Sequence, residues 1–517
     1  MSGLPRAFNA GAFVIDDLAV AFGALFVVIW TLGALYAAVT LPRGQRARLF
    51  AYYAPAAVGG IAVAFAADAI SFYLCFALMA LPGWGLVAHA GTAEARRSGR
   101  VYLAVTVIGE ALLLAALMVL SADAGSIQME AMRMAMPASA HADLAFALVV
   151  GAFALKLGAI GVSGVLPLTY GPAPAGAAAA LAGASIKVGV LGMLRLLPLG
   201  LVADPGWATA LVVLGFASAF GAALLGSLTR TPRAVLGYSS ASQMGLVTIA
   251  VGIGLLDPAA GALAVSAAVA YSLHHGLAKT ALFLGEDVYR HAAGRGATVA
   301  RVALALPALA LVGAPLTSGF VAKYALKEAA HAVPSNLTHT VELLLPWAAV
   351  GTAFLMLRFF VLLESSGSGE AERRGRGPAI IWGAVLVLVA GAAWVWPAEW
   401  SHAAAKSALA PALMWAGFWP GVLAVLVAVA ASAVVRRSKW LQGGVVPPGD
   451  VLLAVDAVAT RAVAPRVELA SPGASAEPSR SRDNARILLE AEEVWTTWSV
   501  AAGIFVVAAV ILAVLAT

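Results

Sequence analysis

Long apolar stretches separated by short polar loops run along almost the whole chain. Each stretch has about the 20 residues that an α-helix needs to cross a lipid bilayer. A span of this kind satisfies its own backbone hydrogen bonds, so it needs no water inside the membrane. The pattern predicts an all-α polytopic membrane protein of about fourteen transmembrane helices, at residues 14–40, 50–67, 69–90, 101–121, 145–168, 174–198, 206–228, 236–255, 261–285, 300–327, 341–364, 378–397, 412–435 and 496–516.

Composition supports this prediction and excludes an ordinary soluble enzyme. Of the 517 residues, 62% are hydrophobic and 11% are charged, whereas soluble domains carry about 25% charged residues. Cys75 is the single cysteine, which excludes a disulfide framework or a cysteine-ligated cluster within the chain. The first residues lack the pattern of a cleavable signal peptide. A net charge of +6 is small for this length and indicates charged loops, with no nucleic-acid surface.

The loops predict how the chain is oriented in the membrane. Cytoplasmic loops are rich in lysine and arginine, and under the fourteen-span count one set of alternate loops holds seventeen basic residues while the other holds Arg133 and Lys406. We therefore expect both termini outside the inner (cytoplasmic) membrane, with a cytoplasmic segment at 437–495 before the last span. The larger set is Arg43, Arg46, Arg48, Arg96, Arg97, Arg100, Arg230, Arg233, Arg290, Arg295, Arg301, Arg373, Arg374, Arg376, Arg436, Arg437 and Lys439.

Two predicted spans are interrupted beside a lysine. Lys156 stands in "FALKLGAIGVSGVLP", before three glycines and a proline, and Lys323 follows Gly313, Pro315 and Gly319. Glycine and proline weaken or break a helix. Interrupted spans at corresponding positions of two halves are typical of transporters built from inverted repeats, with their sites near the midplane. The pattern therefore predicts two broken helices with a lysine at each.

Other ionisable groups inside the spans complete the candidate site. Glu110 has no basic residue one turn away in its own span, so its partner must come from another helix. His275 and Lys279 are four residues apart and share a helix face, whereas His274 points elsewhere and is the weaker candidate. Lysine is a poor metal ligand and no carboxylate or thiolate lies at ligand spacing, so neither a metal nor a cofactor is expected. The predicted proton path is Glu110, Lys156, Lys187, His275, Lys279 and Lys323.

Four segments stand out along the chain: "GASIKVGVLGMLRLLPLG" (183–200), "AVLGYSSASQMGLV" (234–247), "HHGLAKTALFLG" (274–285) and "ALALVGAPLTSGFVAKYALK" (308–327). Together they resemble the antiporter-like subunits of respiratory complex I, Mrp cation/proton antiporters and group 4 membrane-bound hydrogenases. The resemblance covers about 60–365, is nearest to the hydrogenase-type branch, and implies two inverted five-helix repeats with broken helices that carry lysines. It also implies that Lys156 and Lys323 are the charged residues of the two broken helices, and that His275 and Lys279 form the central axis between them.

The chain departs from this family pattern in its first half. The usual glutamate of the helix before Glu110 is missing, and its position is assigned to Leu78, with Ala77 at the preceding tryptophan. Glu110 is then the candidate replacement for the lost carboxylate. Two early helices of the family are also expected to be absent. Further departures are Ser163, Val165 and Tyr170 after the first break, and Pro232 and Arg233 where a charged pair is usual.

The favoured function is a proton-translocating membrane subunit of a multisubunit complex, without a redox centre of its own and driven by a partner such as a redox module. Its expected partners are other membrane subunits, protons and the lipid bilayer, with no nucleic acid. Alternatives are a cation/proton antiporter subunit, a proton-coupled partner of an inorganic-carbon uptake protein, and a degenerate scaffold. The expected organisation is N-terminal helices at 1–60, the proton-translocating core at 61–365, further spans at 366–436, the cytoplasmic segment at 437–495 and a last helix at 496–517.

Overall fold

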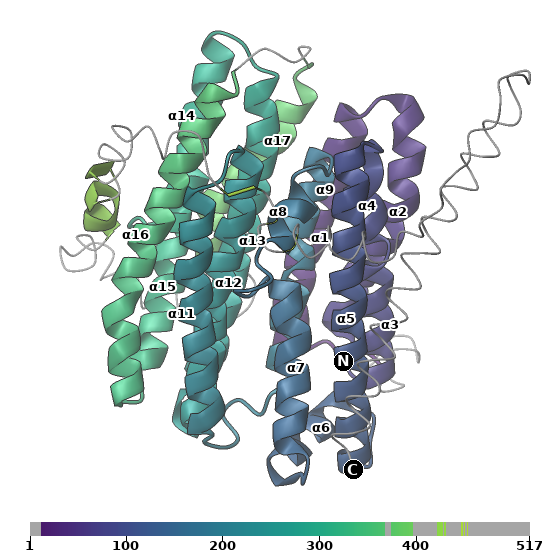
Figure 1. Cartoon of the computed structure of the whole chain (residues 1–517), viewed down its shortest axis with the longest axis vertical. Coiled ribbons are helices and arrows are strands. Elements are labelled where there is room, and N and C mark those ends of the chain that lie inside the picture. The colour runs from purple at the N-terminus through teal and green to yellow at the C-terminus, as the bar shows by residue number, and fades with distance from the viewer. Residues whose placement is uncertain are drawn as a thin grey trace, which may run out of the picture.

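The computed structural model is a bundle of helices, most of which lie nearly parallel to one axis (Figure 1). It describes residues 12–367, 374–395 and a few short stretches between 421 and 452. The first part of the bundle contains α1 (Asp17–Thr40), α2 (Arg43–Ala62), α3 (Ala69–Ala80), α4 (Gly83–Val87), α5 (Ala93–Ala124), α6 (Met129–Ala135), α7 (Ala142–Leu157), α8 (Val165–Tyr170), α9 (Ala175–Ala180) and α10 (Lys187–Leu196).

The second part of the bundle begins after α10. It contains α11 (Pro205–Ser227), α12 (Pro232–Leu256), α13 (Gly261–Arg290), α14 (Arg295–Val312), α15 (Ser318–His331), α16 (Asn336–Ser365) and α17 (Gly377–Val395). Short 3₁₀ turns extend or connect helices at Val63–Phe65, Ala88–Ala90, Met136–Ala138 and Pro258–Ala260, and a π-helical turn at Leu181–Ser185 joins α9 to α10. No β-strand occurs among the residues that the structure describes.

Nine helices or helix runs in the described part of the chain are long and apolar enough to cross a membrane. The predicted spans from 14–40 to 378–397 each correspond to a helix or a pair of helices, and the two spans predicted as broken are α7 with α8 and α14 with α15. Most of the predicted span 412–435, all of 496–516 and nearly all of the cytoplasmic segment 437–495 lie outside the described residues. The chain is therefore a multi-pass membrane protein of mostly helical fold.

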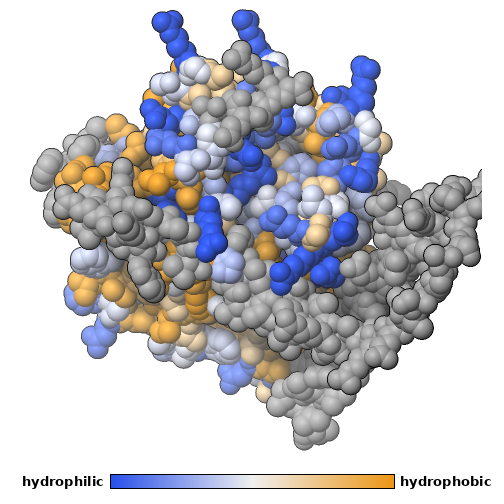
Figure 2. All heavy atoms as spheres, turned by 45° about the horizontal axis from the view of Figure 1, so that its top comes forward, coloured by the Kyte–Doolittle hydropathy of each residue, from blue (hydrophilic) through white to orange (hydrophobic). Residues whose placement is uncertain are grey.

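Successive helices alternate in direction, which gathers the basic loops at one end of the bundle. In Figure 1 this is the upper end, where α2, α5, α12 and α14 begin and α13 and α16 finish. Figure 2 shows this end turned forward, with hydrophilic side chains gathered on it and apolar ones on the flank below. Arg301 on α14 bonds Glu364 of α16 at 2.7 Å, which joins two of these helix ends directly. One end of the bundle thus carries the arginine-rich loops that the sequence assigned to the cytoplasm.

The centre of the bundle is formed by α12, α13 and the run from α9 to α10, whose side chains are almost all buried. Glycines allow these helices to approach closely, as expected in lipid, where small residues favour packing between helices. A Cβ on Gly245 of α12 would lie 2.4 Å from the carbonyl oxygen of Gly215 on α11, so the contact between α11 and α12 requires glycine there. The ionisable groups on α10 and α13 are consequently shielded from both lipid and bulk water.

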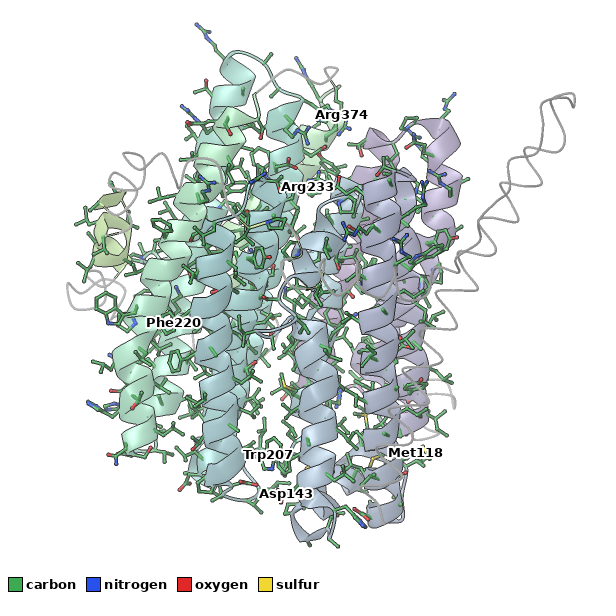
Figure 3. The ribbon with its side chains drawn as sticks, in the orientation of Figure 1. Met118, Asp143, Trp207, Phe220, Arg233 and Arg374 are labelled. Carbon is green, nitrogen blue, oxygen red and sulfur yellow. The ribbon has the colours of Figure 1, made fainter. Side chains whose placement is uncertain are left out.

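Ion pairs fasten the upper ends of the central helices. Arg233, at the start of α12, donates to Glu286 of α13 at 2.9 Å and to the carbonyl oxygens of the loop between α8 and α9. Asp287 accepts a hydrogen bond from Tyr36 of α1 at 2.8 Å and forms an ion pair with Arg374, just before α17. Figure 3 shows Arg233 and Arg374 near the upper end and Asp143 and Trp207 at the opposite end. This network fixes α13 against α1, α12 and α17.

Candidate functional site

The first broken helix places Lys156 in the middle of the bundle. The helix α7 stops at Leu157 because Gly158 adopts a left-handed conformation, at φ 67°, that favours glycine. The backbone N–H of Ala159 then bonds the carbonyl of Ala154, which completes a C-terminal cap of the Schellman type. The chain turns through 158–164 before α8 begins at Val165. The predicted break is confirmed, and it leaves Lys156 in the last turn of α7.

The ammonium of Lys156 faces an aromatic ring and a carboxylate. Its nitrogen lies 5.4 Å from the centre of the Phe76 ring of α3, a cation–π distance. Glu110 of α5 lies within electrostatic reach, although the two groups form no direct ion pair, and the Oε1 atom of Glu110 is buried without a hydrogen-bond partner. The structure therefore brings Glu110 near a lysine of another helix, as the sequence required of its partner.

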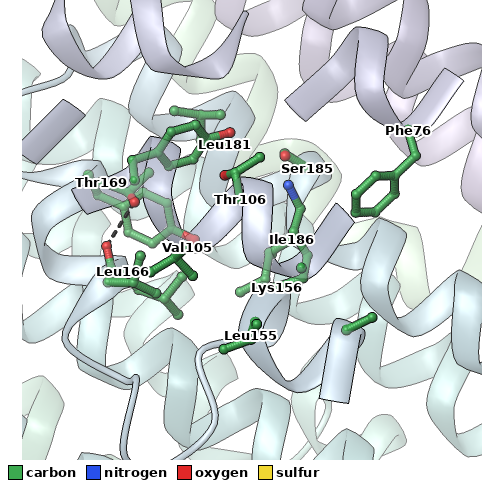
Figure 4. Close-up of a pocket in the computed structure, with 15 residues that line it drawn as sticks. Phe76, Val105, Thr106, Leu155, Lys156, Leu166, Thr169, Leu181, Ser185 and Ile186 are labelled. Atoms are coloured by element: carbon green, nitrogen blue, oxygen red, sulfur yellow. Dashed lines mark hydrogen bonds between the residues drawn. The ribbon is translucent and has the colours of Figure 1, made fainter. Parts of the chain in front are cut away.

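A cavity of about 40 Å³ surrounds the Lys156 side chain. A buried water needs about 10–15 Å³ measured in this way, so the cavity has room for two or three. Figure 4 shows the Lys156 nitrogen pointing toward Thr106 of α5 and Ser185 of the π-helical turn, with Phe76 on the other side. Hydroxyl groups and an ammonium are the polar partners that hold water in an otherwise apolar cavity. Lys156 thus lies beside a small space with room for water.

The π-helical turn positions Lys187 directly after it. Residues Leu181–Ser185 widen the helix, and the fully buried Lys187 donates from Nζ to the carbonyl oxygen of Ala182 at 2.5 Å. Insertions of this kind are rare, and where they occur they are often at functional sites. The same turn supplies Ser185 and Leu181 to the wall of the Lys156 cavity. A single local distortion therefore places Lys187 within one turn of the cavity.

The long helix α13 carries the next group of bases. Lys279 is fully buried and donates to the carbonyl oxygen of Leu236 on α12 at 2.8 Å. His275 is also fully buried, and neither of its ring nitrogens has a hydrogen-bond partner among the described residues. Both residues lie within electrostatic reach of Lys187, which extends the row of bases from α10 to α13.

His274 connects α13 to the second broken helix. Its Nδ1 atom lies 2.9 Å from the hydroxyl oxygen of Ser318, the first residue of α15, while its Nε2 atom is buried without a partner in the described part of the chain. His274 is within electrostatic reach of Lys323 and also of Lys187 and Lys279. The sequence ranked this histidine below His275 because the two point in different directions. In the structure the two histidines have different neighbours. His275 lies within electrostatic reach of Lys187, whereas His274 contacts Ser318 of α15.

The second broken helix holds Lys323 by backbone oxygens. The helix α14 ends at Val312, where Gly313 adopts the left-handed conformation with φ 92°. Lys323 of α15 reaches back and donates from Nζ to the carbonyl oxygen of Leu311 at 3.2 Å and to that of Val312. The C-terminus of a helix carries a partial negative charge, which stabilises a cation there. The predicted break before Lys323 is thus confirmed.

The family model of the NADH:quinone oxidoreductase/Mrp antiporter transmembrane proteins matches residues 66–345, which is more than half of the chain. The chain belongs to this family. The match begins near the end of α2 and extends into α16, so it includes both broken helices and every residue of the predicted path.

Relatives with curated names agree with the family assignment. The chain is 26% identical over 346 residues to formate hydrogenlyase subunit 3 of Escherichia coli, covering 61% of this chain and 57% of that protein. It is 28% identical to NADH-quinone oxidoreductase subunit N of Ectopseudomonas mendocina over 62% of this chain and 67% of that one. It is 26% identical to a Na(+)/H(+) antiporter subunit of Alkalihalophilus pseudofirmus over 57% and 61% of the two chains.

The fold also matches the Mrp complex of Dietzia, with a TM-score of 0.67 at 21% identity, over 92% of this chain and 58% of that chain. The first curated relatives are longer than the matched region, since this chain spans 34% of hydrogenase-4 component B of Escherichia coli and 57% of the formate hydrogenlyase subunit. The comparisons thus support the antiporter-like fold and family for the matched region.

On α3 the structure differs from the position that the sequence assigned to the missing family glutamate. Leu78, to which the missing family glutamate was assigned, is 43% exposed on the outside of the described bundle. The α3 side chain that faces Lys156 is Phe76, two residues earlier. Because α3 is apolar all around, its sequence does not indicate which face turns inward. An aromatic ring therefore occupies the α3 side of Lys156.

Sequence reasoning also missed a polar chain that reaches α16. Tyr271 of α13 donates to the fully buried Gln243 of α12 at 2.7 Å, and Gln243 donates to Thr352 of α16 at 2.8 Å. The Tyr271 ring lies 6.0 Å from that of His274, at a steep angle. The signal was present in "SSASQMG" and "YSLHH", where polar residues interrupt apolar spans. It could not be assigned without knowing which helices are neighbours.

Proposed function

We propose that this chain is a proton-translocating membrane subunit of a multisubunit complex. The observation that carries the proposal is a row of basic side chains inside the helix bundle that extends from one broken helix to the other. Buried ionisable residues are costly in a membrane and usually mark a proton or ion pathway. In this proposal the path follows Glu110, Lys156, Lys187, His275, Lys279 and Lys323, and His274 is added to it between Lys279 and Lys323.

The contacts support transfer along this row. The cavity at Lys156 has room for water and reaches Ser185, next to Lys187. Lys187, Lys279 and His275 lie within electrostatic reach of one another, so a proton on one disfavours a proton on the next. His274 then connects this group with Lys323. Repulsion between neighbouring cations therefore favours transfer of a proton from one group to the next along the row.

The two broken helices support an inverted-repeat arrangement, with α2–α10 as one five-span unit and α11–α16 as the other. In Figure 1, α7 enters from the lower end and α14 from the upper end, and both stop inside the bundle. Each break therefore faces the opposite side of the membrane, which is the geometry that alternating half-channels need. We infer that the basic upper end is cytoplasmic.

A partner must supply the energy in this proposal. The described residues contain no group of three or more histidine, cysteine, aspartate or glutamate side chains that could hold a metal ion. The relatives named above are subunits or components by their names. We infer that this chain, too, works with other membrane subunits, one of which provides a redox or ion-driven step, and that it sits in the inner membrane.

The test uses the complex that copurifies with the full chain, reconstituted into lipid vesicles. We expect Lys156→Met and Lys323→Met each to reduce driven proton movement at least tenfold, measured with a pH-sensitive dye, with the complex still assembled. Lys327→Met is the matched control, because Lys327 is exposed one turn beyond Lys323 on the same helix. Normal proton movement in both path variants would overturn the proposal. Loss in the control as well would indicate damage to α15.

A further inference from the structure

The carbonyl oxygens that hold Lys323 are left free by the sequence of the break. In a helix the carbonyl of Leu311 would accept from the residue four positions later, but that residue is Pro315, which has no N–H. The turn at Gly313 uses the earlier carbonyls of Leu309 and Ala310 instead. The carbonyl oxygens of Leu311 and Val312 both accept hydrogen bonds from Lys323 Nζ.

These two oxygens form a carbonyl cup, defined here as the carbonyl groups of Leu311 and Val312 at the end of α14. Backbone carbonyls at the C-terminus of a half-helix are a common way for transporters to bind sodium ions. In the described part of the chain no acidic side chain pairs with Lys323, so its positive charge is balanced by backbone dipoles alone. The cup therefore accommodates a compact cation by carbonyl oxygens, without a carboxylate.

The cup differs from the sites of the other buried lysines. Lys187 and Lys279 each donate to one carbonyl oxygen inside close-packed helices. Lys323 has two, and its Nζ lies over Gly313, where an added Cβ would approach it to 3.3 Å. Gly421 lies close to the carbonyl of Gly313. Shortening the lysine would therefore leave a space beside the two carbonyl oxygens.

We propose that Lys323 makes the second half of the path selective for protons, because its ammonium occupies a carbonyl cup that would otherwise bind a sodium ion. The tethered ammonium acts as a resident cation that can release a proton but cannot be replaced by Na⁺. This inference rests on the proposed function only in assigning Lys323 to the path. The selectivity itself follows from the geometry of the cup.

The test is sodium binding to the purified complex, measured with radioactive ²²Na⁺ against a choline background. Lys323→Ser opens the cup and adds an oxygen, and we expect saturable binding of about one Na⁺ per chain. Unmodified protein and Lys323→Met, which fills the space with an apolar side chain, should bind less than a tenth as much. Lys323→Ala opens the cup without adding an oxygen and serves if the serine variant does not assemble. Failure of both variants to bind Na⁺, or equal binding by the unmodified protein, would overturn the proposal.

A second substitution tests whether the bound ion uses the cup. A Cβ on Gly313 would lie 3.3 Å from the position of the Lys323 Nζ atom, so adding Gly313→Ala to Lys323→Ser should fill the cup and reduce Na⁺ binding at least tenfold. Unchanged binding in the double variant would mean that sodium binds elsewhere and would overturn the proposal.

Lys323→Arg separates this inference from the proposed function. Its guanidinium keeps a permanent cation in the cup and does not give up its proton, so this variant should bind no more Na⁺ than the unmodified protein and should lose proton movement. Continued proton movement in Lys323→Arg would contradict the proposed path while leaving the sodium result intact. Sodium binding by this variant would contradict the cup.

Discussion

The two broken helices hold their lysines in different ways. Lys156 stands at the end of the first half-helix, in a cavity with room for water, between the Phe76 ring and the Glu110 carboxylate. Lys323 stands on the second half-helix and reaches back to two carbonyl oxygens, with no carboxylate near it in the described residues. The same kind of interruption in sequence therefore produces a lysine beside a small cavity in one half and a backbone-bound lysine in the other.

This difference separates two ways of stabilising a buried cation. A nearby carboxylate offers an interaction whose strength changes when either group gains or loses a proton. Carbonyl dipoles at a helix end do not change when a neighbouring group gains or loses a proton. The first site is thus suited to respond to a neighbouring charge, and the second to hold its cation in one place. The following predictions test this contrast.

The largest effect is expected at the carboxylate. Glu110→Gln removes the negative charge that faces Lys156 in a low-dielectric site, and a loss of about 1.4 kcal/mol there is enough for a tenfold change in rate. We expect driven proton movement to fall at least tenfold in vesicles containing the complex. The matched control is Glu94→Gln, an exposed position at the start of the same helix. Full activity in Glu110→Gln would show that Lys156 needs no switchable partner, and the contrast between the two sites would be lost.

An intermediate effect is expected at the glycines that end the two half-helices. Gly158 and Gly313 both have positive φ, and a Cβ on either would meet a side chain at 2.8 Å, which is Leu166 in the first case and Lys323 in the second. Both alanine variants should lose similar stability, about 1–2 kcal/mol from the left-handed conformation. Only Gly313→Ala should move the lysine, so we expect proton movement to fall about three- to tenfold there and to stay above half in Gly158→Ala. Equal losses in both would assign the effect to strain in the caps.

The breaks were predictable from sequence because they depend on local chemistry. Glycine and proline end a helix at or next to their own positions. As the residues indicated, α7 ends one residue after Lys156 and α14 ends just before Gly313. The presence of a lysine at each break was visible for the same reason. What each lysine contacts was not visible, because those contacts come from elsewhere in the chain. Phe76 lies 80 residues before Lys156 on an evenly apolar helix, and only the packed structure shows which of its faces turns inward.

The neighbours of His274 and His275 also could not be predicted from the sequence. Helix periodicity correctly separated their directions, but it could not say that Ser318 of α15 would lie beside His274. Likewise, the segment "LAGAS" does not predict a π-helical turn, because its residues are ordinary helix formers and small residues. Long-range neighbours and single-residue insertions depend on how the whole bundle packs. These details decide the chemistry at Lys187 and Lys323.

The smallest effect is expected from backbone strain, which differs between the segments that join the two halves of each broken helix. In the first break the residues with positive φ are Gly158 and Gly161, whereas in the second Leu316 adopts φ 63°, a conformation that is costly for a side chain with Cβ. Leu316 is 51% exposed, so Leu316→Gly should relieve the strain with little loss of packing. After the extra chain entropy of glycine is subtracted, we expect a gain of about 0.5–1 kcal/mol, seen as a rise of about 1–2 °C in the apparent melting temperature of the purified complex.

The reverse change in the first break provides the control. Gly161 has φ 94° and open space around it, so Gly161→Ala introduces backbone strain without a steric clash. Its melting temperature should fall by a similar amount. A fall in Leu316→Gly would mean that contacts of the leucine side chain outweigh its backbone strain. In that case the second connection would be a packed element like the first, and the two breaks would differ only in how they hold their lysines.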